Sequence, residues 1–277
     1  MIIRQMTGND RNAAAFLWRF IFEDSEPFTR WFFEKRFCPE HSFAAFDEDR
    51  MIAMTLGRPT RIAAEGTTFG ALLISGVSTL PAYRGQGLMH TLVSAQIAQA
   101  KESGFSCCYL HPVSESLYAS LGFRNGTDAL LIESDPERRQ QRFSIRAGEN
   151  LPAMRRIYDT LLQTHDGMQI RDDEEIRLLL QDYATDGSHM LTAYEGRSPK
   201  GYLIFLDDGT VSELFALCPE AYTALLDEAA IRAGRSLKAI VPVDCGAAGT
   251  RVYSMQYLVF NDAFHLPLKN GFCRLSY

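Results

Sequence analysis

The chain contains 277 residues, of which 46% are hydrophobic and 22% are charged, and its formal net charge is −6 at pH 7. This composition is typical of a soluble globular protein, and no apolar run approaches the roughly 18 residues that a membrane-spanning helix needs. An acidic chain has no overall field that attracts phosphate backbones, so the composition argues against nucleic-acid binding. Since domains usually hold about 100 to 200 residues, we expect two domains.

The N-terminus and the cysteines indicate a cytoplasmic protein. Met1 to Arg4 lead directly into a polar turn at Gly8, without the apolar core and small-residue cleavage site of a secretory signal. The cysteines form no CxxC pair, and we expect reduced, structural thiols. They are Cys38, Cys107, Cys108, Cys218, Cys245 and Cys273.

The first half of the chain alternates helical and strand patterns. After one short strand, apolar residues recur at helical spacing over residues 9–22 and again over 28–37. The elements that follow are a hairpin over 42–56, a hairpin-like stretch over 61–80, a helix over 88–101, a strand over 105–110, a short helix over 114–121 and a strand over 123–132. This order predicts a mixed α/β (α+β) domain over residues 1–134.

A polar segment, DPERRQQR at residues 135–142, has the composition of a linker, and we place the domain boundary there. Beyond it the same order of elements returns. The expected elements are a strand over 143–146, helices over 151–162 and 172–183, strands over 190–195, 201–206 and 211–217, a helix over 221–233 and a strand over 237–243. We therefore predict a tandem duplication, with a second domain over 143–277.

The second copy lacks one feature of the first. In the first copy a strand leads through Pro81 into a glycine turn, Arg84-Gly85-Gln86-Gly87, and then into the helix over 88–101. In the second, the strand over 211–217 reaches its helix through Cys218-Pro219-Glu220, with no glycine turn and no arginine. We expect any chemistry of that turn to be missing from the second copy, which is degenerate in this sense.

The strand, glycine turn and helix N-terminus of the first copy form a pattern that suits an anion. The amides of a first helical turn and the positive end of the helix dipole bind phosphate, and glycines let the backbone approach closely. Arg84 to Met89 resembles the signature of the GNAT N-acetyltransferases: an arginine or glutamine, two free positions, a glycine, another position, and a glycine or alanine. Met89 departs from the small residue usual at the last position.

This resemblance implies acetyl-CoA as a co-substrate and two GNAT-like mixed sheets flanked by helices, the second degenerate. In the family the signature wraps the pyrophosphate of coenzyme A, and the preceding strand lies beside the pantetheine arm and the thioester. The residues implied to bind the coenzyme are Val77, Ser78, Thr79, Arg84, Gly85, Gln86, Gly87, Leu88 and Met89.

The segment over 114–123 resembles the closing segment of the same family, a short helix with a tyrosine shortly before a Gly-Phe pair. Tyr118 occupies the position that the family's general acid would take. A phenol with a pKa near 10 can protonate the thiolate that leaves when an amine attacks a thioester. The alternative is a buried tyrosine that serves packing only.

The sequence leaves the general base open. Glu23, Asp24 and Glu26 are candidates, although a solvated acidic loop explains them as well. Neither His90 nor His111 has a partner at metal-ligand spacing, so we expect no metal site, and His111 is a distant candidate for proton relay.

The tandem arrangement resembles the first two domains of the "enhanced intracellular survival" branch, without the sterol-carrier-like third domain of that branch. We expect transfer of an acetyl group to a primary amine of a small molecule or protein in a ternary complex. The alternative is a non-catalytic acyl-CoA-binding module whose second domain recognises a partner. The acceptor, the acyl length and whether the chain forms a homo-oligomer stay open.

Overall fold

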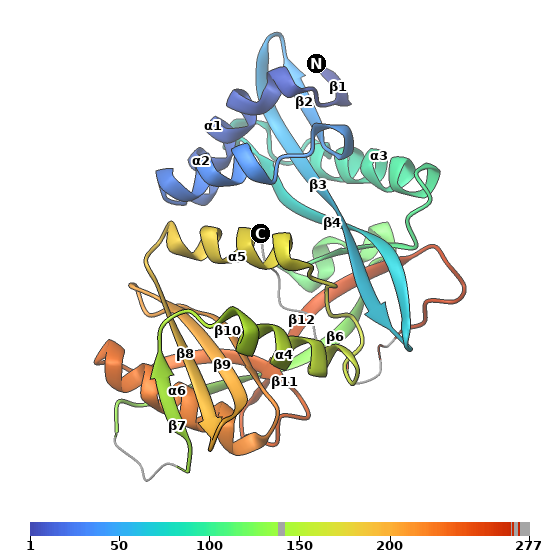
Figure 1. The fold of residues 1–277 in the computed structure, drawn as a ribbon. Coiled ribbons are helices and arrows are strands. Elements are labelled where there is room, and N and C mark those ends of the chain that lie inside the picture. Colours follow the sequence, from blue (N-terminus) through green and yellow to red (C-terminus); the bar gives the residue numbers. More distant parts are fainter. Residues whose placement is uncertain (138–141, 267, 269–270, 272–277) are drawn as a thin grey trace.

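The computed structural model describes residues 1–137, 142–266, 268 and 271, so Cys273 and residues 138–141 of the predicted linker lie outside the described residues. The first half of the chain contains these elements (Figure 1): β1 (Ile2–Gln5), α1 (Arg11–Phe22), α2 (Glu26–Lys35), β2 (Phe43–Asp47), β3 (Arg50–Ala64), β4 (Thr67–Thr79), α3 (Leu88–Glu102), β5 (Cys107–Leu110) and β6 (Arg124–Ser134). Short 3-10 turns lie at Gly8–Asp10, Pro39–His41, Pro81–Tyr83, Glu115–Leu117 and Ala119–Leu121.

The second half follows the same order. It contains β7 (Ser144–Ala147), α4 (Leu151–Leu162), α5 (Asp173–Ala184), β8 (Ser188–Glu195), β9 (Ser198–Leu206), β10 (Val211–Ala216), α6 (Pro219–Ala233), β11 (Leu237–Pro242) and β12 (Thr250–Val259). A strand, two helices, three strands, a helix and two further strands therefore occur once on each side of the predicted linker. The mixed α/β class predicted from the sequence is confirmed.

The first two helices begin and end where local chemistry requires it. The Ser25 hydroxyl accepts a hydrogen bond from the Phe28 amide and caps α2, and α1 ends at Glu23, whose φ is 58°. The two helices pack through aromatic rings, with Trp18 stacked on Phe32 at a centroid distance of 4.8 Å. Their apolar faces thus form one aromatic layer.

One predicted interruption does not exist. The sequence pattern separates a hairpin over 42–56 from another over 61–80, but β3 runs through Gly57 and Pro59 without a break and pairs with β4 along its length. Gly57 instead allows the backbone at His41 to approach β3 closely, because a Cβ on Gly57 would lie 2.3 Å from the His41 carbonyl oxygen. The turn of this long hairpin is Glu65-Gly66, both with positive φ.

The strand order of the larger sheet mixes the two halves of the chain. That order is β1-β2-β3-β4-β5-β12-β6-β11, and a smaller sheet has the order β10-β9-β8-β7. The last strand of the second half, β12, thus lies between β5 and β6, and the last strand of the first half, β6, lies beside β11. Each half places its final strand next to the penultimate strand of the other half, so the boundary at 135–142 does not separate the sheet.

Helices cover both faces of the central strands of the first half. Residues 51–58 of β3 are buried without alternation, the pattern of a strand covered on both faces. In Figure 1, α1 and α2 lie on one side of β3 and β4, and α3 lies on the other. Helix α5 of the second half packs on α2. The first half's sheet therefore contacts the second half on the side of α1 and α2.

The described cysteines agree with a reduced, structural role for the thiols. Cys38, Cys107, Cys108, Cys218 and Cys245 are all free of disulfides. Burial raises the pKa of the Cys108 thiol to about 12, which leaves it unreactive at neutral pH.

In the part of the chain that the structure describes, no helix is both long and apolar enough to cross a membrane.

Candidate functional site

Strands β4 and β5 separate partway along their length. They pair in parallel only through Ala71–Leu73 and Cys107–Tyr109, and β5 ends at Leu110 while β4 continues to Thr79. Among the described residues, no strand pairs with residues 75–79 on the β5 side. Backbone groups of this segment are therefore available to a ligand that lies between the two strands.

A bulge in β4 marks this opening. Gly76 and Val77 face the single residue Thr55, because the register pairs Met54 with Ser78 and Leu56 with Ser75. Gly76 has a φ of 57°, and a Cβ there would lie 2.6 Å from Cζ3 of Trp18. The aromatic layer of α1 and α2 thus rests directly against the bulge.

Val77, Ser78 and Thr79 follow the bulge at the end of β4. Val77 is partly buried, and Ser78 is 6% exposed with a buried hydroxyl that has no partner among the described residues. A buried hydroxyl without a hydrogen-bond partner is costly, and a water or a bound polar group would remove that cost. This is an observation on the protein alone that fits a coenzyme with amide groups.

The predicted glycine turn is exposed and open. Arg84 to Gly87 are all exposed, and the Arg84 Nε donates to the Thr79 carbonyl oxygen at 3.2 Å, which ties the turn to the end of β4. Gly85 and Gly87 have φ values of 78° and 75°, and a Cβ at either would meet no atom within 4 Å. No neighbouring protein atom would block a side chain at either position. Glycine is favoured there by the positive φ values of the backbone.

The N-terminus of α3 has the properties of an anion site. Gly87 is its N-cap, no side chain caps it, and no acidic residue lies in the first turn. The amides of such a turn have no intrahelical acceptors, and the helix dipole adds partial positive charge. Leu88 is buried in the core, while Met89 is partly buried, so the backbone rather than these side chains faces the open turn.

Tyr118 lies between two 3-10 turns instead of within the predicted helix. It is 4% exposed and packs edge-on against Phe123 at a centroid distance of 5.9 Å. Val77 and Met89 also pack against the hydrophobic cluster that contains Tyr118, so the strand after the bulge and the start of α3 border the same cluster. Burial raises the pKa of Tyr118, which keeps the phenol protonated at neutral pH.

The acidic candidates of the α1–α2 loop have partners. The Trp18 indole donates to Asp24 at 2.7 Å, and Glu26 pairs with Arg30 at 2.9 Å. Glu23 serves as the left-handed C-cap of α1. None of these contacts identifies a general base, and the base stays open.

The contact between α2 and α5 contains charged residues that the sequence analysis did not identify. Arg36, the residue that follows α2, pairs with Glu175 of α5 at 2.8 Å, and Arg58 of β3 reaches the same carboxylate at 3.3 Å. Asp182, also on α5, is 5% exposed. Nothing in the spacing of these residues shows that they meet, because the contact joins the two halves of the chain.

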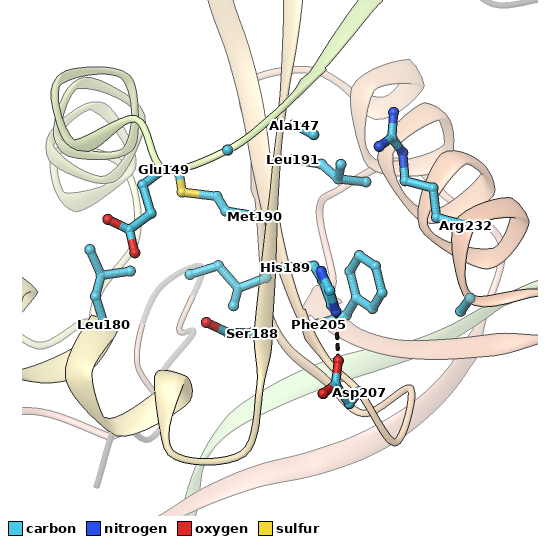
Figure 2. Close-up of a pocket in the computed structure, with 13 residues that line it drawn as sticks. Ala147, Glu149, Leu180, Ser188, His189, Met190, Leu191, Phe205, Asp207 and Arg232 are labelled. Atoms are coloured by element: carbon cyan, nitrogen blue, oxygen red, sulfur yellow. Dashed lines mark hydrogen bonds and ion pairs between the residues drawn. The ribbon is translucent and has the colours of Figure 1, made fainter.

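A separate cavity of about 530 Å³ lies in the second half, at the ends of β7, β8 and β9. Figure 2 shows His189 beside Asp207, with Nε2 and Oδ1 2.7 Å apart, and Phe205 next to the imidazole. Both side chains of the pair are more than half exposed, and such pairs contribute little to stability or specificity. We assign no role to this cavity.

The described residues contain no group of three or more histidine, cysteine, aspartate or glutamate side chains arranged to hold a metal ion. His90 is exposed near the start of α3, and His111 is exposed just after β5.

Residues 2–126 match the family described as acetyltransferase (GNAT) domain. No curated protein matches the chain in sequence. Solved structures that share its fold over most of its length include the following three. A GCN5-related N-acetyltransferase from Anabaena variabilis is 14% identical, with a TM-score of 0.71 over 93% of this chain and 72% of that one. A GCN5-related N-acetyltransferase from Kribbella flavida is 16% identical, with a TM-score of 0.67 over 93% of this chain and 71% of that one.

The third structure is Eis1 from Mycobacterium abscessus, which is 14% identical with a TM-score of 0.68 over 94% of this chain and 74% of that one. At these identities the likeness shows the fold of the two halves together. The matched GNAT domain contains β4, the glycine turn, α3 and Tyr118. The first half of the chain is therefore similar to GNAT acetyltransferase domains.

Proposed function

We propose that the first half of this chain is an acetyl-CoA-dependent N-acetyltransferase that acetylates a primary amine by direct attack in a ternary complex. The observation that carries the proposal is the joint presence of the opening between β4 and β5, the open glycine turn and the uncapped α3 N-terminus. They are consecutive along the chain, and together they offer a strand edge for an extended arm and a helix end for a pyrophosphate.

The residues that bind the co-substrate divide into two groups in this proposal. Gly85, Gln86, Gly87 and the amides of Leu88 and Met89 hold the pyrophosphate, with Arg84 holding the turn to β4. Val77, Ser78 and Thr79 line the thioester end, where backbone amides stabilise the negative charge that develops on the carbonyl oxygen. When bound, acetyl-CoA supplies the activated acetyl group.

Tyr118 acts as the general acid. The amine nitrogen forms a bond to the thioester carbonyl carbon, the carbon–sulfur bond breaks, and the phenol donates its proton to the departing sulfur. The nitrogen loses one proton to solvent, and the phenolate takes one back from solvent, which restores the acid. A tyrosine whose pKa is raised by burial stays protonated throughout the neutral range, as this role requires. The products are an amide and free coenzyme A.

The second half closes the acceptor side. We propose that residues 143–277 are a degenerate copy whose α5 covers the face of α1 and α2 opposite to α3, since α5 packs on α2 and contributes Glu175. The exchange of β6 and β12 between the halves holds that wall in place. The free cysteines are consistent with a reducing compartment, and we place the reaction in the cytoplasm.

The test is release of free thiol from acetyl-CoA across amines, polyamines, aminoglycosides, amino acids and lysine peptides, with wild type and Tyr118→Phe. We expect turnover with one class, and a kcat lower by about 10²- to 10⁴-fold in the variant with little change in acetyl-CoA affinity. Tyr83→Phe is the matched control, because its hydroxyl donates to Asp47 at 2.7 Å, away from the cluster of Tyr118.

Turnover that is equal in Tyr118→Phe and wild type would remove the acid role. Binding of acetyl-CoA without turnover on any amine would favour the non-catalytic acyl-CoA-binding module instead.

A further inference from the structure

A polar side chain lies in the buried face of α3. The structure describes this helix over its whole length, and its buried residues are apolar except Gln96. The Nε2 of Gln96 donates to the His41 carbonyl oxygen at 2.7 Å, and its Oε1 accepts a hydrogen bond from the Thr55 hydroxyl at 2.6 Å. The amide group of Gln96 therefore connects α3 both to β3 and to the 3-10 turn Pro39–His41 that precedes β2.

The backbone of β3 leaves room for this amide group. A Cβ on Gly57 would lie 2.6 Å from Nε2 of Gln96, so glycine is required where the side chain passes. Gln96 and Thr55 are both fully buried, and a buried amide costs free energy unless its hydrogen bonds are made. An apolar helix face needs no such bonds. Because hydrogen bonds are directional and apolar contacts are not, the buried amide specifies one position of α3 on the sheet.

Thr55, the partner of this amide, is the residue opposite the bulge in β4. Gly76 and Val77 both face it across the strand pair. On one face of the sheet, Trp18 of α1 lies against Gly76. On the other face, where α3 lies in Figure 1, Gln96 binds Thr55. The bulge is thus fixed by a different helix on each side of the sheet, and on the α3 side the hydrogen bond of Gln96 makes this connection.

We infer that Gln96 is a positioning residue for the co-substrate, which sets the N-terminus of α3 relative to the bulge in β4. The inference rests on the proposed function, in which these two places hold the pyrophosphate and the thioester of one acetyl-CoA molecule. Gln96 lies about 12 Å along the helix from Leu88, so it acts through the position of α3 and not by contact with the pyrophosphate. A displacement of about 1 Å between the two places is enough to weaken the fit of a ligand that spans both.

The experiment titrates acetyl-CoA and 3′-phospho-ADP, the nucleotide end of coenzyme A, into wild type and Gln96→Met. Methionine has nearly the length of glutamine and makes neither hydrogen bond. The nucleotide needs only the helix end, so its affinity should change by less than about twofold, whereas that of acetyl-CoA should fall about 10-fold. The matched control is Gln99→Met. Gln99 donates to the same turn, at the Glu40 carbonyl oxygen, and makes no hydrogen bond to Thr55 among the described residues, so its variant should keep both affinities.

The double variant Thr55→Val/Gln96→Met separates position from stability. Both partners of the hydrogen bond are then apolar, so the unfolding midpoint should rise relative to Gln96→Met, while the affinity for acetyl-CoA stays low. Where Gln96→Met does not fold, the double variant serves for the same comparison of the two ligands.

Three results would overturn the inference: an unchanged affinity for acetyl-CoA in Gln96→Met, an equal loss for acetyl-CoA and the nucleotide, or an affinity for acetyl-CoA that recovers with stability in the double variant. In each of these, wild type still binds acetyl-CoA and the proposed function stands. If wild type binds no acetyl-CoA, the proposed function fails, and the inference fails with it.

Discussion

The helices α3 and α6 occupy equivalent places in the two halves, and their N-termini differ in each property that binds an anion. Gly87 caps α3 in a left-handed conformation, and no proline or acidic residue follows in the first turn. Cys218 caps α6 in an extended conformation, Pro219 removes one amide, and Glu220 places a carboxylate in the first turn. The same element order therefore supports an anion site in one half and excludes it in the other.

The strands that precede these helices differ in the same way. In β4 the buried hydroxyl of Ser78 has no partner among the described residues. In β10 Glu213 is 1% exposed, pairs with Arg171 at 2.7 Å, and accepts a hydrogen bond from Tyr202 at 2.9 Å. The second half thus has a buried ion pair of its own on the strand that corresponds to the one where we propose that the first half binds its co-substrate.

The largest expected effect concerns this ion pair. Glu213→Leu leaves the guanidinium of Arg171 buried without its partner, and we expect a loss of about 3–5 kcal/mol in the free energy of unfolding. Urea denaturation measures it. The double variant Arg171→Met/Glu213→Leu should recover most of the loss, because the buried charge is then removed. A loss below about 1 kcal/mol in the single variant would contradict the buried ion pair that we describe.

A second effect concerns Asp182 of α5, the helix that packs on α2. Its pKa is raised from 3.8 to about 8, chiefly by burial, so its protonated form is favoured in the folded state. The contribution to stability is fully present below pH 3.8 and is lost as the pH rises toward 8. Asp182→Asn cannot ionise, so the stability of wild type should fall relative to the variant between about pH 4 and 8. Parallel pH profiles would contradict this prediction.

The smallest effect makes α3 resemble α6. His90 is exposed in the first turn of α3, and His90→Glu adds a carboxylate there, as Glu220 does in α6. We expect the helix to gain about 0.3–1 kcal/mol from the dipole while acetyl-CoA binding weakens several-fold. His90→Gln is the control, because glutamine has nearly the shape of glutamate without its charge and should leave the affinity for acetyl-CoA unchanged. Unchanged affinity in His90→Glu would mean that no anion binds at this helix end.

Much of the fold follows from local patterns in the sequence. The helices α1 to α6 lie within a few residues of their predicted ranges, and α4 spans residues 151–162 as expected. Helical periodicity and capping residues are local signals, so single segments reveal them. The coenzyme-binding residues form one continuous stretch from strand to helix, and their identification from sequence has the same basis, although it stays a prediction.

The exchange of strands could not be predicted in this way. No element was assigned to residues 244–277, and β12 pairs with β5 and β6, more than 100 residues earlier in the chain. Periodicity shows that a segment can be a strand but not which strand it joins. The pairing of Arg36 with Glu175 is missed for the same reason, because it spans 139 residues and requires the second half to fold against the first.

The most direct test is calorimetric titration of acetyl-CoA into wild type and Gly87→Val. A β-branched residue at a φ of 75° is strained, and its side chain would occupy the open space at the α3 N-terminus, where an added Cβ meets no protein atom within 4 Å. The account predicts one bound acetyl-CoA per chain in wild type, because α6 lacks the open helix end that α3 has. It predicts an affinity lower by about 100-fold or more in the variant. Two bound molecules per chain, or equal affinity in Gly87→Val, would contradict it.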